Sequence, residues 1–114
     1  VADTGAVVGQ SRERGYDLGR RSYDRLDPAG RAVFLADGGR TWTLVGNPPA
    51  GSGGPPRIEA SDHAVRFTRE ADGLRATAEV TLPDGDAAEL WTITVENPGD
   101  TPRTVAVVPY LEWV

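Results

Sequence analysis

The chain has 114 residues, of which 39% are hydrophobic and 25% charged, as expected for one soluble domain with a single core. The net charge is −5, and all 12 basic residues are Arg, scattered along the chain apart from Arg12-Arg14 and Arg20-Arg21. This argues against nucleic acid, because phosphate neutralisation needs clustered basic residues. The sequence has no Cys, which excludes disulfides and thiolate metal sites, and no apolar run approaches the ~20 residues of a membrane-spanning helix. We expect a cytoplasmic protein with no membrane association.

The first part of the chain predicts short strands joined by tight turns. Residues 1–22 are polar and Gly-rich, and they predict an edge strand or a mobile segment. A β-sandwich domain is expected over 23–114. In it, 31–37 and 41–45 predict a hairpin across Asp37-Gly38-Gly39-Arg40, because Asp-Gly and Gly-Gly are strong turn signals.

The middle of the chain begins with a Pro- and Gly-rich stretch over 47–56, which predicts a long surface loop because Pro cannot complete a sheet ladder. A strand is expected over 58–69, followed by a turn at 71–73. The clearest strand runs over 74–82, where apolar residues alternate with polar ones and mark one buried face.

The last segment is the most strongly patterned. Over 91–96, apolar and polar residues alternate, and Asn97-Pro98-Gly99-Asp100 then has the residues of a turn. A second β-rich run over 104–114 is apolar at both its odd and its even positions. These features predict a β-hairpin whose second strand is central and covered on both faces. The whole pattern predicts an all-β fold, an antiparallel β-sandwich or part of one.

Candidate catalytic and metal residues are few. His63 is the only His and lies next to Asp62, so a His-based site would rest on one side chain, and a turn position is the favoured interpretation. Asp84, Asp86 and Glu89 suggest Ca²⁺ ligands, but they lack the full loop spacing and also suit a turn. We expect no metal, no cofactor and no catalytic residue in this chain.

Aromatic side chains are the remaining candidates, since their faces stack on sugar rings. Trp91 and Trp113 lie on alternating strands, where a core position is favoured. Beside loops, Tyr23 and Trp42 are better placed for a sugar, and Arg25 can supply hydrogen bonds. The predicted sugar-binding residues are therefore Tyr23, Arg25 and Trp42.

Three stretches carry a family resemblance. Residues 89–103, Glu-Leu-Trp-Thr-Ile-Thr-Val-Glu-Asn-Pro-Gly-Asp-Thr-Pro-Arg, continue to Val-Pro-Tyr-Leu-Glu-Trp at 108–113. Together with 23–37 and 73–81, they resemble the N-terminal β-sandwich domain of the inverting disaccharide phosphorylases of glycoside hydrolase family 94, formerly glycosyltransferase family 36. The cellobiose and chitobiose phosphorylases belong to this group, and the cyclic β-1,2-glucan synthases are related.

This resemblance implies a galactose-mutarotase-like super-sandwich, of which 114 residues supply only a part. It implies a non-catalytic domain that braces a following (α/α)₆ catalytic barrel in a longer polypeptide and borders the sugar site, with a homodimer and an oligosaccharide as further partners. A chain without any Met is likewise expected to be a piece of something longer. The alternatives are a free-standing carbohydrate-binding module and a structural sandwich without a ligand.

Overall fold

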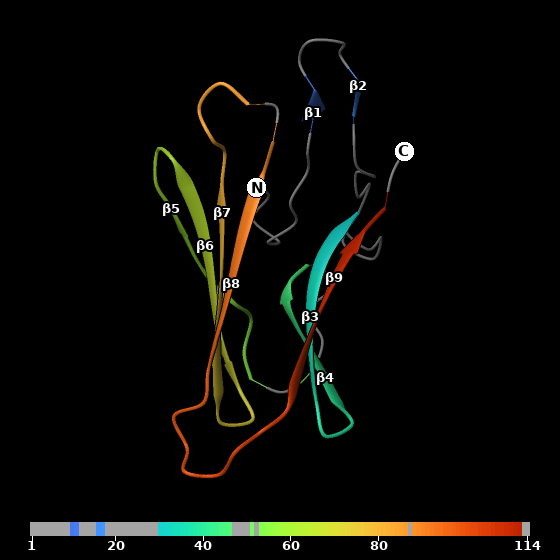
Figure 1. Ribbon diagram of the computed structural model, residues 1–114, viewed down its shortest axis with the longest axis vertical. Coiled ribbons are helices and arrows are strands. Elements are labelled where there is room, and N and C mark those ends of the chain that lie inside the picture. Colours follow the sequence, from blue (N-terminus) through green and yellow to red (C-terminus); the bar gives the residue numbers. More distant parts are fainter. Residues whose placement is uncertain are drawn as a thin grey trace.

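A computed structural model describes residues 10–11, 16–17, 30–46, 51, 53–86 and 88–112 (Figure 1). These residues form strands, turns and loops, and within them no helix is long and apolar enough to cross a membrane. The strands are β1 (Gln10–Ser11), β2 (Tyr16–Asp17), β3 (Arg31–Asp37), β4 (Arg40–Val45), β5 (Arg57–Ala60), β6 (Ala64–Ala71), β7 (Leu74–Thr81), β8 (Leu90–Glu96) and β9 (Val105–Leu111).

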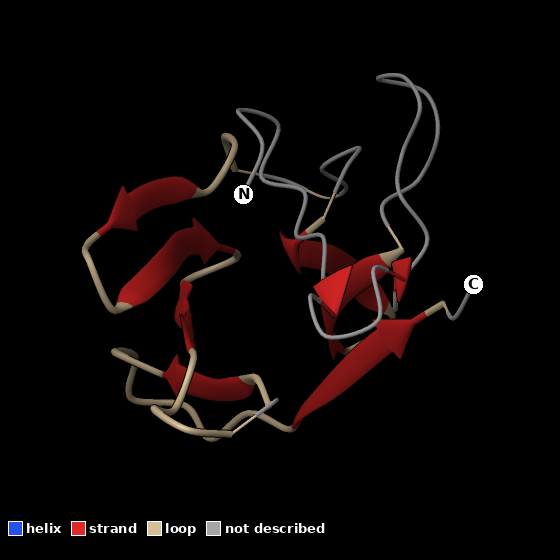
Figure 2. Cartoon of the chain, turned by 90° about the horizontal axis from the view of Figure 1, so that it is seen from above, coloured by secondary structure: helices blue, strands red, loops and turns tan. Residues whose placement is uncertain are grey.

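All strand pairs are antiparallel. β1 and β2 form a short ribbon, β4-β3-β9 form a three-stranded sheet, and β5-β6-β7-β8 form a four-stranded sheet. Figure 1 shows the two larger sheets side by side, and Figure 2 shows the four-stranded sheet curving around the space between them. Side chains of β3, β4, β6 and β7 fill that space. The predicted all-β antiparallel sandwich is confirmed.

The core is built from the alternating faces of these strands. Leu74, Ala76 and Ala78 of β7 are buried, as the 74–82 pattern predicts. In β4 the last four residues are all buried because a bulge interrupts the pairing with β3: Phe34 pairs with Thr43, but Val33 pairs with Val45. The extra residue changes which side chains face inward, so burial there no longer follows period 2.

Both predicted tight hairpins are present. β3 turns into β4 through Gly38 and Gly39, and β6 turns into β7 through Asp72 and Gly73. At the second turn both residues have positive φ, +50° for Asp72 and +75° for Gly73, as the type I′ turn of a two-residue hairpin requires. The expected strand over 58–69 is instead two strands, β5 and β6, because Ser61 accepts a hydrogen bond from the Ala64 N–H and turns the chain.

The predicted β8–β9 hairpin is wrong. The local turn chemistry is as expected, since Asn97 accepts from the Gly99 N–H and donates to the Thr101 carbonyl at 2.8 Å. However, β8 pairs with β7 and β9 pairs with β3, so the connection crosses from one sheet to the other. The two strands therefore belong to different layers of the sandwich.

The prediction that β9 is central and covered on both faces is also wrong in this chain. β9 is an edge of the three-stranded sheet, and six of its seven residues are exposed. Its register continues the inner face, because Val107 lies opposite the buried Leu35. Among the described strands β9 contacts only β3, and no strand of the other sheet covers it, which is why its apolar sequence does not translate into burial.

Candidate functional site

Arg69 is a charged residue inside the core. It is 3% exposed and lies on the same face of β6 as the buried Phe67. Its guanidinium donates to the carbonyl oxygens of Thr43 and of Gly53, the latter at 3.0 Å, and lies 5.9 Å from the ring centroid of Trp42. Burial lowers the pKa of Arg69 below its usual value, but arginine stays protonated at neutral pH. A buried cation here connects both sheets with the Gly-rich loop.

The loop held by Arg69 approaches the core so closely that it needs glycine. Gly51 and Gly53 have φ of +90° and +80°. A Cβ on Gly51 would lie 2.3 Å from the Cβ of Trp42, and a Cβ on Gly53 would lie 2.4 Å from the Glu70 carbonyl oxygen. The described part of the predicted 47–56 loop therefore packs against the end of the sandwich.

Arg103 fixes the crossing between β8 and β9. Its guanidinium pairs with the Asp37 carboxylate at the end of β3 and donates to the Asp72 carbonyl in the β6–β7 turn. The Asp72 carboxylate accepts in turn from Arg40 at 3.1 Å. One side chain thus joins the turns of both sheets, which gives a structural role to the Arg that ends the resembling motif.

Glu89 makes a second ion pair that joins the two sheets, at the opposite end of β3. It pairs with Arg31 and accepts a hydrogen bond from the Trp91 indole N–H at 3.2 Å. Asp84 and Asp86, two of the suggested Ca²⁺ ligands, are exposed. Over the part of the chain that the structure describes, no group of three His, Asp or Glu is arranged to hold a metal ion.

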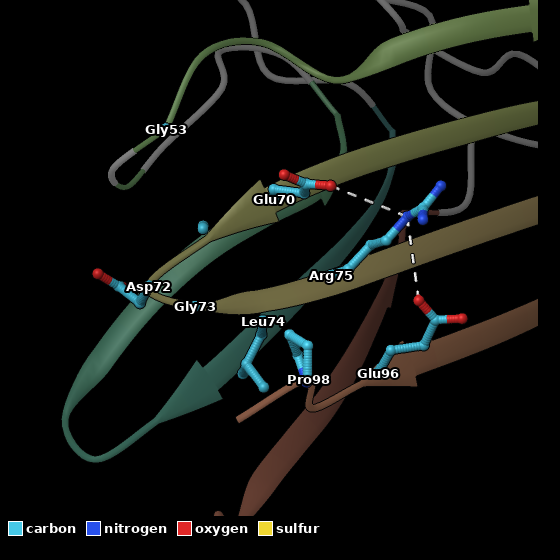
Figure 3. Close-up of a pocket in the computed structure, with 9 residues that line it drawn as sticks. Gly53, Glu70, Asp72, Gly73, Leu74, Arg75, Glu96 and Pro98 are labelled. Carbon is cyan, nitrogen blue, oxygen red and sulfur yellow. Dashed lines mark ion pairs between the residues drawn. The ribbon is translucent and has the colours of Figure 1, made fainter. Parts of the chain in front are cut away.

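A shallow hollow lies at the β6–β7 turn (Figure 3). Arg75 stands in it between Glu70 and Glu96, at N–O distances of 4.0 and 3.9 Å. All three side chains are more than half exposed, so this is a solvated surface ion pair rather than a preorganised catalytic pair. His63 lies exposed in the β5–β6 turn and joins no such group.

One described strand, β9, exposes apolar side chains on both of its sides. Val107 is 42% exposed, Val108 47%, Tyr110 46% and Leu111 43%. Val107 and Leu111 lie on the inner side of β9, and Val108 and Tyr110 on the outer side. We call these four residues the β9 surface. Each side of β9 thus exposes two apolar side chains, and exposed apolar groups of this kind are typical of a site that packs against another protein surface.

Of the three predicted sugar-binding residues, the structure describes only Trp42. Trp42 is 1% exposed, and its ring is part of the core, so stacking of a sugar on this side chain is not supported. Its position on a buried strand beside the Gly-rich loop explains this, because the loop covers it instead of presenting it. Tyr23 and Arg25, like Trp113, lie outside the described residues, and their sugar-binding role stays a prediction.

Two features were missed from the sequence. Arg69 alternates along β6 with the buried Phe67 and Ala71, so it lies on the face of the strand that points into the core. This position in the sequence was the signal that could have identified a buried arginine. The β9 surface was recognised as apolar on both faces, but its exposure depends on which strands lie beside it. Alternation alone does not report this.

The fold and its motifs agree with a sequence comparison. Residues 11–114 match the model of the supersandwich domain of glycosyl hydrolase family 94, so the chain belongs to this family of β-sandwich domains from carbohydrate-active enzymes. No solved structure matches the chain significantly.

Individual relatives share low identity with it. The chain is 27% identical over 92 residues to N,N'-diacetylchitobiose phosphorylase of Vibrio furnissii, covering 76% of this chain and 11% of that protein. The corresponding enzyme of Vibrio proteolyticus is 25% identical over 97 residues, covering 77% and 12%. Cellobionic acid phosphorylase of Neurospora crassa is 32% identical over 83 residues, covering 71% and 10%. The chain thus spans about a tenth of the length of these relatives.

Proposed function

We propose that this chain is the non-catalytic N-terminal β-sandwich domain, or part of it, of a longer phosphorylase-like enzyme. In this enzyme a separate (α/α)₆ barrel would use phosphate to cleave or exchange a β-linked disaccharide. Support comes from membership of the supersandwich family and from relatives about ten times longer that are named as disaccharide phosphorylases.

The domain's contribution is to brace the catalytic region by burying the β9 surface. The observation that carries this proposal is the contrast between a tightly packed core and a neighbouring strand with four large apolar side chains 42–47% exposed. Burial of apolar area is the main favourable term in association, so covering these side chains stabilises the assembled protein. The same surface is where a second copy would pack if the protein is a homodimer.

The proposal is tested first by size. An antibody against residues 53–86 should detect, in the source cells, a polypeptide much larger than the 12.1 kDa of this chain. A native product of that small mass would contradict it and favour the free-standing alternative.

A role at the border of the sugar site is tested separately. Glucose, cellobiose and chitobiose are titrated into the protein while amide NMR shifts are followed. Shifts that cluster around Tyr23 and Arg25 and vanish in Tyr23→Ala would support it. No shift at ~10 mM sugar, weaker than the millimolar end of useful affinity, would leave the domain with a bracing role alone.

A further inference from the structure

Three turns of the described chain contain the same dipeptide, Asp followed by Gly. They are Asp37-Gly38 between β3 and β4, Asp72-Gly73 between β6 and β7, and Asp84-Gly85 between β7 and β8. In such a dipeptide the Asp carboxyl group lies close to the backbone nitrogen of the next residue, and Gly leaves this nitrogen unshielded because it has no Cβ. The two groups can react with each other, so each turn is a candidate site for a change in the backbone.

The reaction needs only water. The Gly nitrogen attacks the carboxyl carbon of the Asp side chain, a C–N bond forms, and the hydroxyl of the protonated carboxyl group leaves with the amide proton as water. The product is a five-membered succinimide ring. A second water molecule then attacks one of the two ring carbonyls and breaks its C–N bond. Attack on the side-chain carbonyl returns aspartate, whereas attack on the main-chain carbonyl gives isoaspartate. The reaction therefore requires a carboxyl group that is free to turn toward the nitrogen.

Two of the three carboxyl groups are held by arginines. The Asp37 carboxylate pairs with Arg103, and the Asp37 side chain is 15% exposed. The Asp72 carboxylate accepts a hydrogen bond from Arg40 at 3.1 Å, its carbonyl accepts one from Arg103, and its side chain is 19% exposed. Both dipeptides also join paired strands directly, so the ladders on either side fix their backbone. These contacts keep both carboxyl groups away from the nitrogen.

The third dipeptide is in a different environment. Asp84 is exposed, and in the part of the chain that the structure describes no hydrogen bond or ion pair holds its carboxylate. Gly85 has a φ of +83° and open space around its Cβ position. Both residues lie beyond the last pair of the β7–β8 ladder, Thr81 with Leu90, so the sheet does not fix their backbone.

We propose that Asp84-Gly85 is a site of spontaneous isoaspartate formation, whereas the fold protects the other two dipeptides. In isoaspartate the main chain runs through the Asp side chain, so the connection from β7 to β8 becomes longer by a methylene group. This connection leads to Glu89, whose ion pair with Arg31 joins the two sheets. The site thus gives the protein an age-dependent change of backbone in the segment that positions this ion pair.

The sequence separates the three dipeptides into different tryptic peptides, 32–40, 70–75 and 76–103. The complete polypeptide that contains these residues is kept folded for weeks at neutral pH in water labelled with heavy oxygen, and it is then digested in ordinary water. Each opening of the ring adds one labelled oxygen atom. Peptide 76–103 should gain label at least ~10-fold faster than the other two, because a held group reacts only when the structure opens locally. Fragmentation should place the label and the isoaspartate at Asp84.

Two controls separate the effect of the fold from that of the sequence. In short synthetic peptides around each dipeptide, where no fold holds the carboxyl group, the three rates should lie within about threefold of one another. Arg40→Met removes the partner of the Asp72 carboxylate. Since the Arg40 side chain is 69% exposed, this variant keeps its fold, which circular dichroism checks. Peptide 70–75 should then gain label faster than in the unchanged protein, while the rate at Asp84 stays the same.

The folded protein decides the outcome. If peptide 76–103 gains label no faster than the other two, the structure does not select among the three dipeptides and the inference is overturned. It is also overturned if the short peptides show the same order and spread of rates as the folded protein, because the neighbouring residues would then explain them. An unchanged rate for peptide 70–75 in Arg40→Met would contradict protection by the arginine.

Discussion

β4 and β9 are the two edges of one sheet, and both are rich in apolar residues, yet one is buried and the other exposed. In β4, Trp42, Leu44 and Val45 are at most 1% exposed because β6 and β7 lie across from them and the Gly-rich loop closes the end. In β9, Val107 and Val108 are more than 40% exposed. An apolar sequence thus indicates that the side chains of a strand need to be buried. The arrangement of the strands decides whether other parts of this chain bury them.

The largest expected effect comes from removing the centre of the covered edge. Trp42→Ala should lower the free energy of unfolding by about 3–5 kcal/mol, since a large aromatic side chain is lost and its cavity closes only in part. Urea unfolding followed by far-UV circular dichroism measures it. Val108→Ala on the other edge is the control and should cost less than about 1 kcal/mol, because Val108 is already half in solvent. Equal losses would mean that β9 is covered in solution.

Arg69→Met should have the next largest effect, about 2–4 kcal/mol. The substitution keeps much of the side-chain volume but leaves the Thr43 and Gly53 carbonyls without their charged donor. Urea unfolding and faster amide exchange at Gly53 report it. Arg57→Met, where the side chain is 76% exposed, is the control and should stay within about 0.5 kcal/mol. If Arg69→Met is as mild as the control, the loop is held by other contacts.

The strands and turns of the buried part of the sandwich could largely be predicted from the sequence. Alternation in β7, and turn residues such as Gly38, Gly39 and Gly73, predicted strands and hairpins because both signals act over a few residues. The bulge in β4 was not predictable, since it depends on which residue of β3 lies opposite.

The predictions that were wrong concern contacts between residues far apart in the sequence. The Asn97 turn has the residues of a hairpin, but Arg103 reaches Asp37 and Asp72 and ties the chain to the second sheet. Sheet membership is set by such non-local contacts. The burial of Trp42 likewise depends on a non-local contact, because Gly51 packs against it. Tyr23 and Arg25 remain predictions.

Gly51→Ala should destabilise the protein by about 2–3 kcal/mol, because it combines a strained positive φ with a close contact to Trp42. Gly39→Ala separates the two causes. Gly39 has a φ of +83° but open space around its Cβ position, so only the backbone strain of about 1 kcal/mol applies. Thermal unfolding of both variants measures the difference. If both lose the same amount, the loop moves away from Trp42 at little cost.

The smallest effect is expected at Arg66, which shares β6 with Arg69 but lies on the solvent side. Its ion pair with Glu79, at 2.6 Å, raises the pKa of Arg66, since the hydrogen bond favours the charged form. Water and salt screen such a pair, so Arg66→Gln should leave the urea midpoint unchanged within the error of the measurement at 0.15 M salt. A clear loss that persists in 1 M salt would contradict this. Two arginines three residues apart would then be equally important, and the distinction between a covered and an open face of the same strand would no longer explain the stability of the sandwich.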